Sequence, residues 1–347
     1  MSKVMKTMDG NEAAAYASYA FTEVAAIYPI TPSSPMAEHV DTWAAHGKKN
    51  IFGTPVKLVE MQSEAGAVSA VHGALDAGAL ATSYTASQGL MLMIPTMFRI
   101  AGQLKPGVIH VASRNVATST ISIFAEHSDV MACRQTGFAM LCSSTVQEAM
   151  DLGAVSHLSA IKGHIPFLHF FDGFRTSHEI QKVECLDYDK LYEALDKEEL
   201  KKFRDESLTP EKPILRTTGQ NADTYFQQRE AVNPYYENLP DVVESCMAEI
   251  NKITGRDYHL FNYYGAPDAE YVIVGMGSVT GTIQETLDYL AAQGKKAGYL
   301  EVHLSDRSPQ SISSKPFRRQ SRRSQFLTAT RKPAQSASLF MRKSAQC

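Results

Sequence analysis

The chain is predicted to be an α/β protein: a doubly wound parallel sheet followed by the beginning of a second α/β domain. Short apolar runs alternate with segments whose apolar residues recur at helical spacing, a pattern typical of parallel sheets covered by helices. After a charged interval punctuated by proline, the same alternation starts again near residue 270. The length of 347 residues also suits two domains.

The first predicted strand covers residues 24–30, and a helix follows it closely. Ser33 or Ser34 can cap that helix, with Pro35 in its first turn. Thr31 therefore stands between the end of a strand and the start of a helix, where ligands bind in parallel α/β sheets. From spacing alone, a plain turn residue is the better interpretation of Thr31.

The segment of residues 57–78 has the most unusual composition in the chain. A short apolar run leads into the carboxylate of Glu64, after which Ala, Gly and Ser dominate. We predict a buried strand and then a helix with Glu64 in its first turn. Gly73 and Gly78 cost helix stability relative to Ala, which indicates close packing by another backbone or a flat ligand. Glu64 is then either a helix-start residue or a catalytic group.

Four further apolar runs complete the predicted first sheet, at residues 80–85, 107–113, 138–141 and 165–171. The helix expected at 90–101 is apolar nearly all round and therefore buried, with Pro95 kinking it or marking its start. Another helix is expected to start at a capping box formed by Ser144 and Gln147 and to run to about residue 162.

Two charged side chains that follow the second of these runs are candidate functional groups. Arg114 stands at the end of the strand 107–113, where a solvated surface charge is the ordinary interpretation. Because Thr31 and Glu64 occupy similar junctions, Arg114 becomes a candidate clamp for a carboxylate, which guanidinium binds in a bidentate manner. His127 stands beside acidic residues, and a structural histidine is a better interpretation of it than a general base.

Residues 174–255 are predicted to wrap around the first domain as a linker, so that the first domain spans 1–255. Residues 256–304 then give a strand at 270–276, a helix at 279–293 and a strand at 297–304, the beginning of a truncated second α/β domain. The turn at 275–278 resembles half of a phosphate-binding loop, but a tight βα turn is the better interpretation.

Charge divides the chain into two parts. The formal net charge is −3, yet residues 306–347 hold ten Lys or Arg and one acid, so the first 305 residues carry a net charge of −12. Residues 305–347 lack apolar periodicity and are predicted to be a disordered basic tail. Such a tail could bind nucleic acid, or its residues could be foreign to the native sequence.

Cysteine usage and hydropathy exclude several classes of protein. The five cysteines are scattered without a CxxC pair, so neither a metal cluster nor a disulfide framework is expected. No apolar run approaches about 18 residues and the N-terminus has no signal-peptide core, so we expect a cytoplasmic protein without a membrane span.

Three long stretches resemble the N-terminal part of pyruvate:ferredoxin (flavodoxin) oxidoreductases. They are, in this order, MDGNEAAAYASYAFTEVAAIYPITPSSPMAEHVDTWAA, VKLVEMQSEAGAVSAVHGALDAGALATSYTASQGLMLMIP and HVASRNVATSTISIFAEHSDVMACRQTGFAML. The resemblance covers the first 304 residues. It implies that residues 1–255 are the family's thiamine pyrimidine-binding domain and that 256–304 begin a transketolase C-terminal-like domain. The family's CoA-contacting, iron–sulfur and diphosphate-binding domains have no counterpart here.

The resemblance implies an enzyme of anaerobic metabolism. The full-length protein would oxidatively decarboxylate pyruvate with CoA to acetyl-CoA and CO₂ and reduce ferredoxin or flavodoxin. It would be a cytoplasmic homodimer without nucleic-acid or membrane partners. Its cofactors would be thiamine diphosphate, of which this chain holds only the pyrimidine half, with Mg²⁺ and [4Fe–4S] clusters bound outside this chain.

The resemblance also assigns roles to four residues. Glu64 matches the residue whose carboxyl bonds to N1′ of the thiamine aminopyrimidine ring. Thr31 and Arg114 match residues that hold the pyruvate carboxylate, and Pro29 matches a backbone position lining the same pocket. His127 receives no role, and no metal ligand is implied in this chain.

The tail limits these expectations. Back-translated with freely chosen codons and shifted by one nucleotide, it can give a capped helix and a buried strand similar to the family's continuation. We therefore expect residues from about Ser305 to be out of frame and the chain alone to be inactive. An alternative is a non-catalytic or pyrimidine-binding subunit of a multi-subunit 2-oxoacid:ferredoxin oxidoreductase. A nucleic-acid binder would depend on the tail alone.

Overall fold

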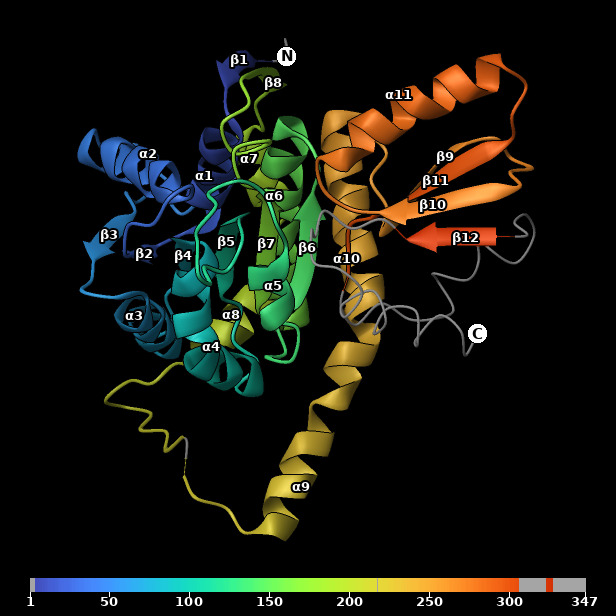
Figure 1. Cartoon of the computed structure of the whole chain (residues 1–347). Coiled ribbons are helices and arrows are strands. Elements are labelled where there is room, and N and C mark those ends of the chain that lie inside the picture. The colour runs from blue at the N-terminus through green and yellow to red at the C-terminus, as the bar shows by residue number, and fades with distance from the viewer. Residues whose placement is uncertain (1–3, 217, 306–322, 327–347) are drawn as a thin grey trace.

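The computed structural model describes residues 4–216, 218–305 and 323–326, and for the last segment only the backbone (Figure 1). Its largest sheet has six strands in the order β3-β2-β4-β5-β7-β6. All five neighbouring pairs are parallel, which confirms the predicted doubly wound sheet. The strands are β2 (Val24–Ile27), β3 (Lys57–Glu60), β4 (Ala81–Thr85), β5 (Val108–Ser113), β6 (Ala139–Ser143) and β7 (Phe167–Asp172).

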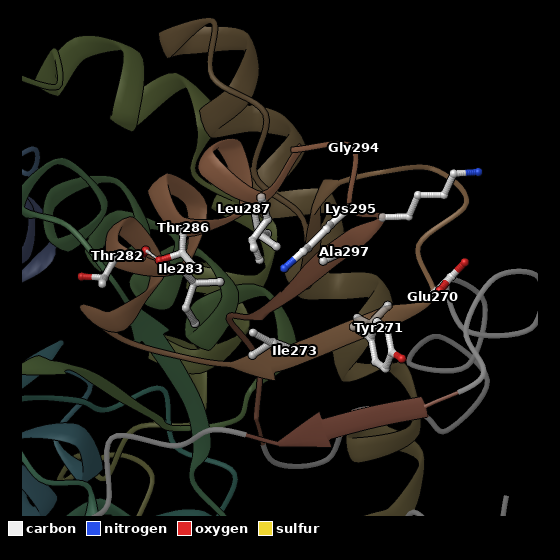
Figure 2. Close-up of a pocket in the computed structure, with 13 residues that line it drawn as sticks. Glu270, Tyr271, Ile273, Thr282, Ile283, Thr286, Leu287, Gly294, Lys295 and Ala297 are labelled. Atoms are coloured by element: carbon white, nitrogen blue, oxygen red, sulfur yellow. Dashed lines mark hydrogen bonds between the residues drawn. The ribbon is translucent and has the colours of Figure 1, made fainter. Parts of the chain in front are cut away.

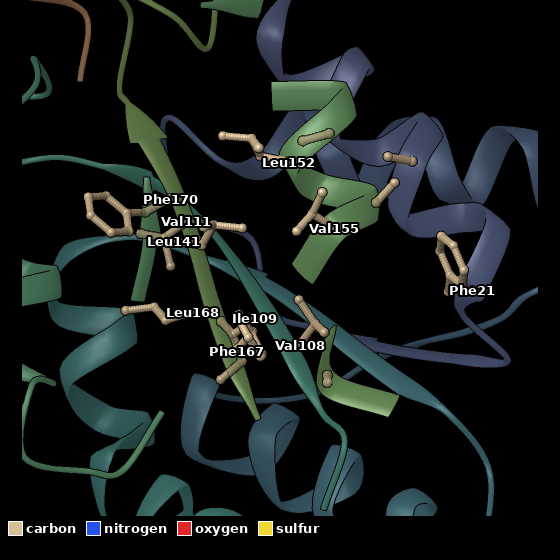
Figure 3. Close-up of a cluster of buried hydrophobic side chains, with 14 of the residues drawn as sticks. Phe21, Val108, Ile109, Val111, Leu141, Leu152, Val155, Phe167, Leu168 and Phe170 are labelled. Carbon is tan, nitrogen blue, oxygen red and sulfur yellow. The ribbon is translucent and has the colours of Figure 1, made fainter. Parts of the chain in front are cut away.

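Helices cover both faces of this sheet. They are α1 (Gly10–Phe21), α2 (Ser34–Ala45), α3 (Glu64–Asp76), α4 (Ser87–Gly102), α5 (Ser128–Ala132) and α6 (Val146–Gly163). Helices α1 and α6 pack on one another, and α3 packs on α4. Every residue of β4 to β7 is buried, as expected for parallel strands covered on both sides. Figure 3 shows Leu152 and Val155 of α6 turned toward the side chains of β5 and β7.

Side-chain caps fix where the helices begin. Thr145 is the N-cap of α6 and accepts a hydrogen bond from the backbone N–H of Glu148, 3.2 Å away. The Glu148 carboxylate in turn accepts from the backbone N–H of Ser144 at 2.7 Å. The capping box predicted at Ser144 and Gln147 is therefore wrong by one residue, because Thr145 and Glu148 have the same spacing and make the bonds instead.

The interval between the two units is mostly helical. Strand β8 (Gln181–Glu184) pairs antiparallel with the N-terminal β1 (Met5–Met8), and neither strand was predicted. Four helices follow: α7 (Tyr188–Ala194), α8 (Lys197–Asp205), α9 (Ala222–Ala231) and α10 (Asn233–Thr254). Helix α10 packs along α6, so this interval adds a layer to the first unit.

The second unit is a four-stranded sheet of order β12-β10-β11-β9. Strands β10 (Tyr271–Gly275) and β11 (Ala297–Val302) are parallel and joined by α11 (Val279–Ala292), as predicted. Strand β9 (Phe261–Gly265) adds an antiparallel edge that the sequence pattern did not predict.

Most of the tail expected to be disordered lies outside the described residues. The exceptions are Ser305 and β12 (Arg323–Phe326). Strand β12 pairs in parallel with β10, so the expectation of disorder is wrong for these four residues. The edge of β10 offers backbone N–H and C=O groups, which can pair with another strand almost regardless of that strand's side chains. Within the described ranges, no helix has the length and apolarity needed to cross a membrane.

Candidate functional site

The chain segments that leave β2, β5 and β7 meet at the carboxyl edge of the six-stranded sheet. A Cβ added to Gly173, directly after β7, would lie 2.8 Å from Cγ of Pro32 and 2.7 Å from the carbonyl oxygen of Ser113. Asn11 at the start of α1 donates from Nδ2 to the carbonyl of Pro32 at 2.9 Å. The loop carrying Thr31 therefore adjoins the strand end that carries Arg114.

Glu64 begins α3 and reaches toward the next strand–helix junction. Its N-cap Ser63 accepts from the backbone N–H of Gly66, so the cap does not need the Glu64 side chain. Only 7% of Glu64 is exposed. A Cβ at Gly89 would lie 2.6 Å from Glu64 Oε1 and 2.7 Å from Thr85 Oγ1. The carboxylate thus lies against α4, in space that exists because residue 89 is glycine.

Gly73 lies within α3 and Gly78 lies just after its end, and neither contacts the Glu64 carboxylate. Gly73 is exposed, and a Cβ there would meet nothing within 4 Å. Gly78 has φ of +84°, a left-handed conformation just after the end of α3. The predicted close packing is therefore wrong for Gly73. At Gly78 a Cβ would lie 2.7 Å from Cβ of Ser207, so close packing is present there and comes from another segment of the chain. The glycine that makes room beside Glu64 is Gly89, on a different helix.

Arg114 is buried although it stands at a strand end. Only 6% of it is exposed, and its Nε has no hydrogen-bond partner within the described chain. Burial lowers the pKa of the Arg114 guanidinium, and the nearby Asp129 carboxylate opposes that shift. Guanidinium remains protonated in proteins, so a buried cation with a spare donor suits a carboxylate ligand.

Asp129 organises this edge, and no pattern in the sequence singled it out. It is fully buried. Its oxygens accept from the backbone N–H of Ser87 (2.8 Å), the hydroxyl of Ser113 (2.7 Å), and the backbone N–H of Arg114 (3.1 Å) and Val130 (2.7 Å). Burial raises the pKa of Asp129, whereas these four hydrogen bonds lower it. One side chain thus joins the start of α4, the end of β5 and α5.

His127 and Asp172 form a buried ion pair at the end of β7. His127 Nε2 lies 2.6 Å from Asp172 Oδ1. Burial lowers the pKa of His127, but the Asp172 carboxylate outweighs it, so the net shift is upward. Asp172 Oδ2 also accepts from the backbone N–H and hydroxyl of Ser278 at 2.8 and 2.5 Å. The pair therefore fastens the turn before α11 to the first unit.

Pro29 and Thr31 are exposed residues between β2 and α2. They stand at the same edge of the sheet as Glu64 and Arg114, with their surfaces open to a ligand. The Pro29–Thr31 loop lies beside the end of β5 that carries Arg114, because Pro32, the next residue, packs near that strand end. Glu64 lies at the neighbouring β4–α4 junction.

Several buried polar atoms at this edge have no partner in the described chain. They are Asn11 Oδ1, Thr85 Oγ1, Arg114 Nε, Glu126 Oε1 and His127 Nδ1. Buried polar atoms in proteins are nearly always hydrogen-bonded, so unpartnered ones indicate a missing ligand or water. Donors and acceptors are both present, which fits a polar ring and a carboxylate.

A hollow of about 720 Å³ lies elsewhere, between α11 and β10 in the second unit (Figure 2). Its lining includes Ile273, Ile283 and Leu287 and none of the predicted site residues. Because its lining is mostly apolar and includes none of the predicted site residues, we place the candidate site at the carboxyl edge of the first sheet instead.

Comparison with known proteins identifies the family to which most of the chain is similar. The family model described as "Pyruvate flavodoxin/ferredoxin oxidoreductase, thiamine diP-bdg" matches residues 15–248. The chain is 65% identical over 304 residues to a pyruvate-flavodoxin oxidoreductase of Klebsiella pneumoniae, covering 88% of this chain and 26% of that protein. It is 58% identical over 299 residues to a pyruvate:ferredoxin oxidoreductase of Moorella thermoacetica, covering 86% and 26%.

Among solved structures, a 2-oxoglutarate:ferredoxin oxidoreductase from Magnetococcus marinus has the same fold. The TM-score is 0.73 at 17% identity, over 98% of this chain and 60% of that one. At this identity the likeness concerns the fold alone. The chain spans about a quarter of the length of the two curated relatives named above.

Proposed function

Because the chain belongs to the pyruvate flavodoxin/ferredoxin oxidoreductase family, we propose that it forms the half of a thiamine diphosphate site that holds the aminopyrimidine ring. The observation that carries this proposal is the buried carboxylate of Glu64, which lies against Gly89 beside the unpartnered hydroxyl of Thr85. A flat ring with a basic nitrogen suits that carboxyl group, since burial excludes water that would compete for the hydrogen bond.

Thiamine diphosphate supplies a nucleophilic carbon that adds to a 2-oxo acid and takes up the electron pair released on decarboxylation. Glu64 would hold a proton between its carboxyl group and N1′ of the pyrimidine ring. Glu64 stands in the first turn of α3 and only 7% of it is exposed, so little water competes for this bond.

Arg114 and Thr31 would bind and orient the carboxylate of the substrate. Arg114 offers a buried guanidinium with an unpartnered Nε, and Thr31 offers an exposed hydroxyl on the adjoining loop. The backbone at Pro29 would line the same pocket. Asp129 supports this arrangement, since its bond to the Arg114 backbone fixes where the guanidinium side chain starts.

In the complete protein, we propose, this site oxidises pyruvate with CoA to acetyl-CoA and CO₂ and reduces ferredoxin or flavodoxin. Mg²⁺ and iron–sulfur clusters would be bound outside the described residues, and the protein would act as a cytoplasmic homodimer. The high identity to relatives named for pyruvate supports pyruvate as the substrate. A subunit of a multi-chain 2-oxoacid oxidoreductase is the second candidate and has only the fold likeness in its favour.

A graft tests the proposal. Residues 1–304 would replace the corresponding part of the Klebsiella pneumoniae relative, and viologen reduction would be measured with CoA and either pyruvate or 2-oxoglutarate. We expect turnover with pyruvate from the graft and none from the 347-residue chain alone, which would hold only half of the cofactor site. A graft that loads its cofactors but turns over neither substrate would contradict the proposal, and turnover with 2-oxoglutarate alone would contradict pyruvate as the substrate.

A further inference from the structure

Three side chains able to ligate a metal meet between the two units of the chain. They are Glu148 in the first turn of α6, Glu301 on β11 and His303 just beyond β11, with one ligand atom of each within 4.8 Å of the others. His303 Nε2 lies 3.7 Å from Glu301 Oε1 and 3.8 Å from Glu148 Oε2. These separations are too long for hydrogen bonds. They approach the roughly 3.3–3.6 Å between ligands that share a tetrahedral zinc ion with bonds of about 2.0–2.2 Å.

His303 is oriented as a metal-binding histidine is. Its Nδ1 lies 2.8 Å from the carbonyl oxygen of His259 and must donate to it, since a carbonyl only accepts. Only 2% of His303 is exposed, and its Nε2 has no hydrogen-bond partner in the described chain. In metal-binding histidines, the ring nitrogen that does not bind the metal usually donates its N–H to a carbonyl or carboxylate oxygen. This bond fixes the tautomer and the orientation of the ring.

The two carboxylates are also held in place. Ser144 donates from its backbone N–H to Glu148 Oε2 at 2.7 Å and from its hydroxyl to Glu301 Oε1 at 2.5 Å. Thr280 donates from its hydroxyl to Glu301 Oε1 at 3.0 Å. Two carboxylates brought together at a largely buried interface repel one another unless a positive charge, on a bound metal ion or on a protonated His303, offsets them.

We propose that Glu148, Glu301 and His303 bind a divalent transition-metal ion that joins the second unit to the first. One imidazole nitrogen and two carboxylate oxygens suit Zn²⁺, Co²⁺ or Mn²⁺ better than Ca²⁺ or Mg²⁺, which prefer oxygen alone. The site is independent of the proposed thiamine chemistry, since none of its ligands contributes to that pocket.

Cobalt binding tests the site on the 347-residue chain. After the chain has been stripped with a chelator, we expect a single Co²⁺ to bind per chain with visible absorption bands and without the near-ultraviolet band of a thiolate ligand. Zn²⁺ should displace the cobalt and raise the temperature at which the chain unfolds. The His303→Gln and Glu301→Gln variants should each bind Co²⁺ at least about tenfold more weakly.

His259→Gln is the matched control. Its imidazole bonds to Glu244 and Asp257 in an exposed cluster, and only its backbone contacts His303. This variant should bind cobalt as the unchanged chain does. If His303→Gln fails to fold, Ser144→Ala, which keeps all three ligands, should still weaken binding about tenfold. Equal cobalt binding by the unchanged chain and His303→Gln, or none by either, would overturn the proposal. The three side chains would then be held together by a shared proton instead of a metal ion.

Discussion

Gly89 lies directly against the carboxylate of Glu64, although 25 residues separate them in the chain. A Cβ at position 89 would be only 2.6 Å from Glu64 Oε1, closer than real Cβ contacts occur. The first turn of α4 and the first turn of α3 therefore form one small enclosure around a carboxyl group. Thr85, with an unpartnered hydroxyl, borders the same space.

Replacing Glu64 by Gln in the grafted enzyme should lower kcat at least about hundredfold, because an amide cannot share a proton with a ring nitrogen. The unfolding temperature should stay close to that of the parent, since the α3 cap uses Ser63 rather than Glu64. Glu60→Gln is the control, because Glu60 is an exposed carboxylate at the end of β3. Equal viologen reduction by the two variants would remove Glu64 from the mechanism.

Gly89→Ala should lower activity while leaving the fold intact. The added Cβ would push the Glu64 carboxylate and Thr85 hydroxyl out of position, although Ala favours a helix more than Gly does. The matched variant is Gly73→Ala, at an exposed helical glycine with nothing within 4 Å. That change should stabilise the chain by about 0.5–1 kcal/mol in urea unfolding and leave kcat unchanged. Undiminished kcat in Gly89→Ala would show that the enclosure has no role in turnover.

The buried parallel strands could be predicted because strands covered on both faces are continuous apolar runs, as residues 107–113 and 165–171 show. Strand β9 could not, because its sequence FNYYG is partly exposed at a sheet edge and lacks such a run. Pairing between β1 and β8 depends on segments some 175 residues apart, and no local pattern encodes it.

The site was predictable in part for a similar reason. Glu64 and Arg114 stand at strand–helix junctions that the chain pattern reveals, and the resemblance gave them expected roles. The role of Asp129 depends on hydrogen-bond partners as distant in the chain as Ser87, 42 residues earlier. The sequence of a polar loop does not indicate which of its carboxylate side chains is buried. Thr85 and Gly89 were hidden because their relevance comes only from contact with Glu64.

Asp129→Asn should destabilise the chain by about 2–4 kcal/mol, because the amide nitrogen that replaces one carboxylate oxygen would face donors instead of accepting from them. The two oxygens accept from four donors in the described structure. Urea unfolding of the 347-residue chain measures the effect, with the exposed Asp41→Asn as control. A difference below about 0.5 kcal/mol between the two variants would mean that Asp129 does not hold the edge together.

Three buried histidines under the sheet form a directed chain of hydrogen bonds. Ser143 donates to the carbonyl of Glu148, so its oxygen must accept from His169 Nε2, 2.8 Å away. His169 Nδ1 then accepts from His110 Nδ1 at 2.8 Å, and His110 Nε2 accepts from His157 Nε2 at 3.0 Å. Each ring is therefore a defined neutral tautomer, and a proton added to any of them would break the sequence of donors and acceptors.

The stability of the chain should consequently fall as the pH drops below about 6.5. Burial lowers the pKa of His157 and His169 to about 3 and that of His110 well below its usual value. Below pH 6.5 the unfolded chain takes up protons that the folded chain refuses, so unfolding becomes easier by up to about 1.4 kcal/mol per pH unit for each ring, until the folded pKa is reached.

His157→Phe isolates one of these contributions. Phe keeps a ring that can stack on Phe21, which lies 5.3 Å from the His157 ring between centroids, but it cannot titrate. Between pH 6 and 5 its unfolding free energy, measured in urea, should fall less steeply than that of the parent, by about 1 kcal/mol per pH unit. His127 shifts in the opposite direction and is common to both proteins, so it cancels in the comparison. Parallel curves would mean that His157 already takes up its proton in the folded state, and the directed chain would then be wrong.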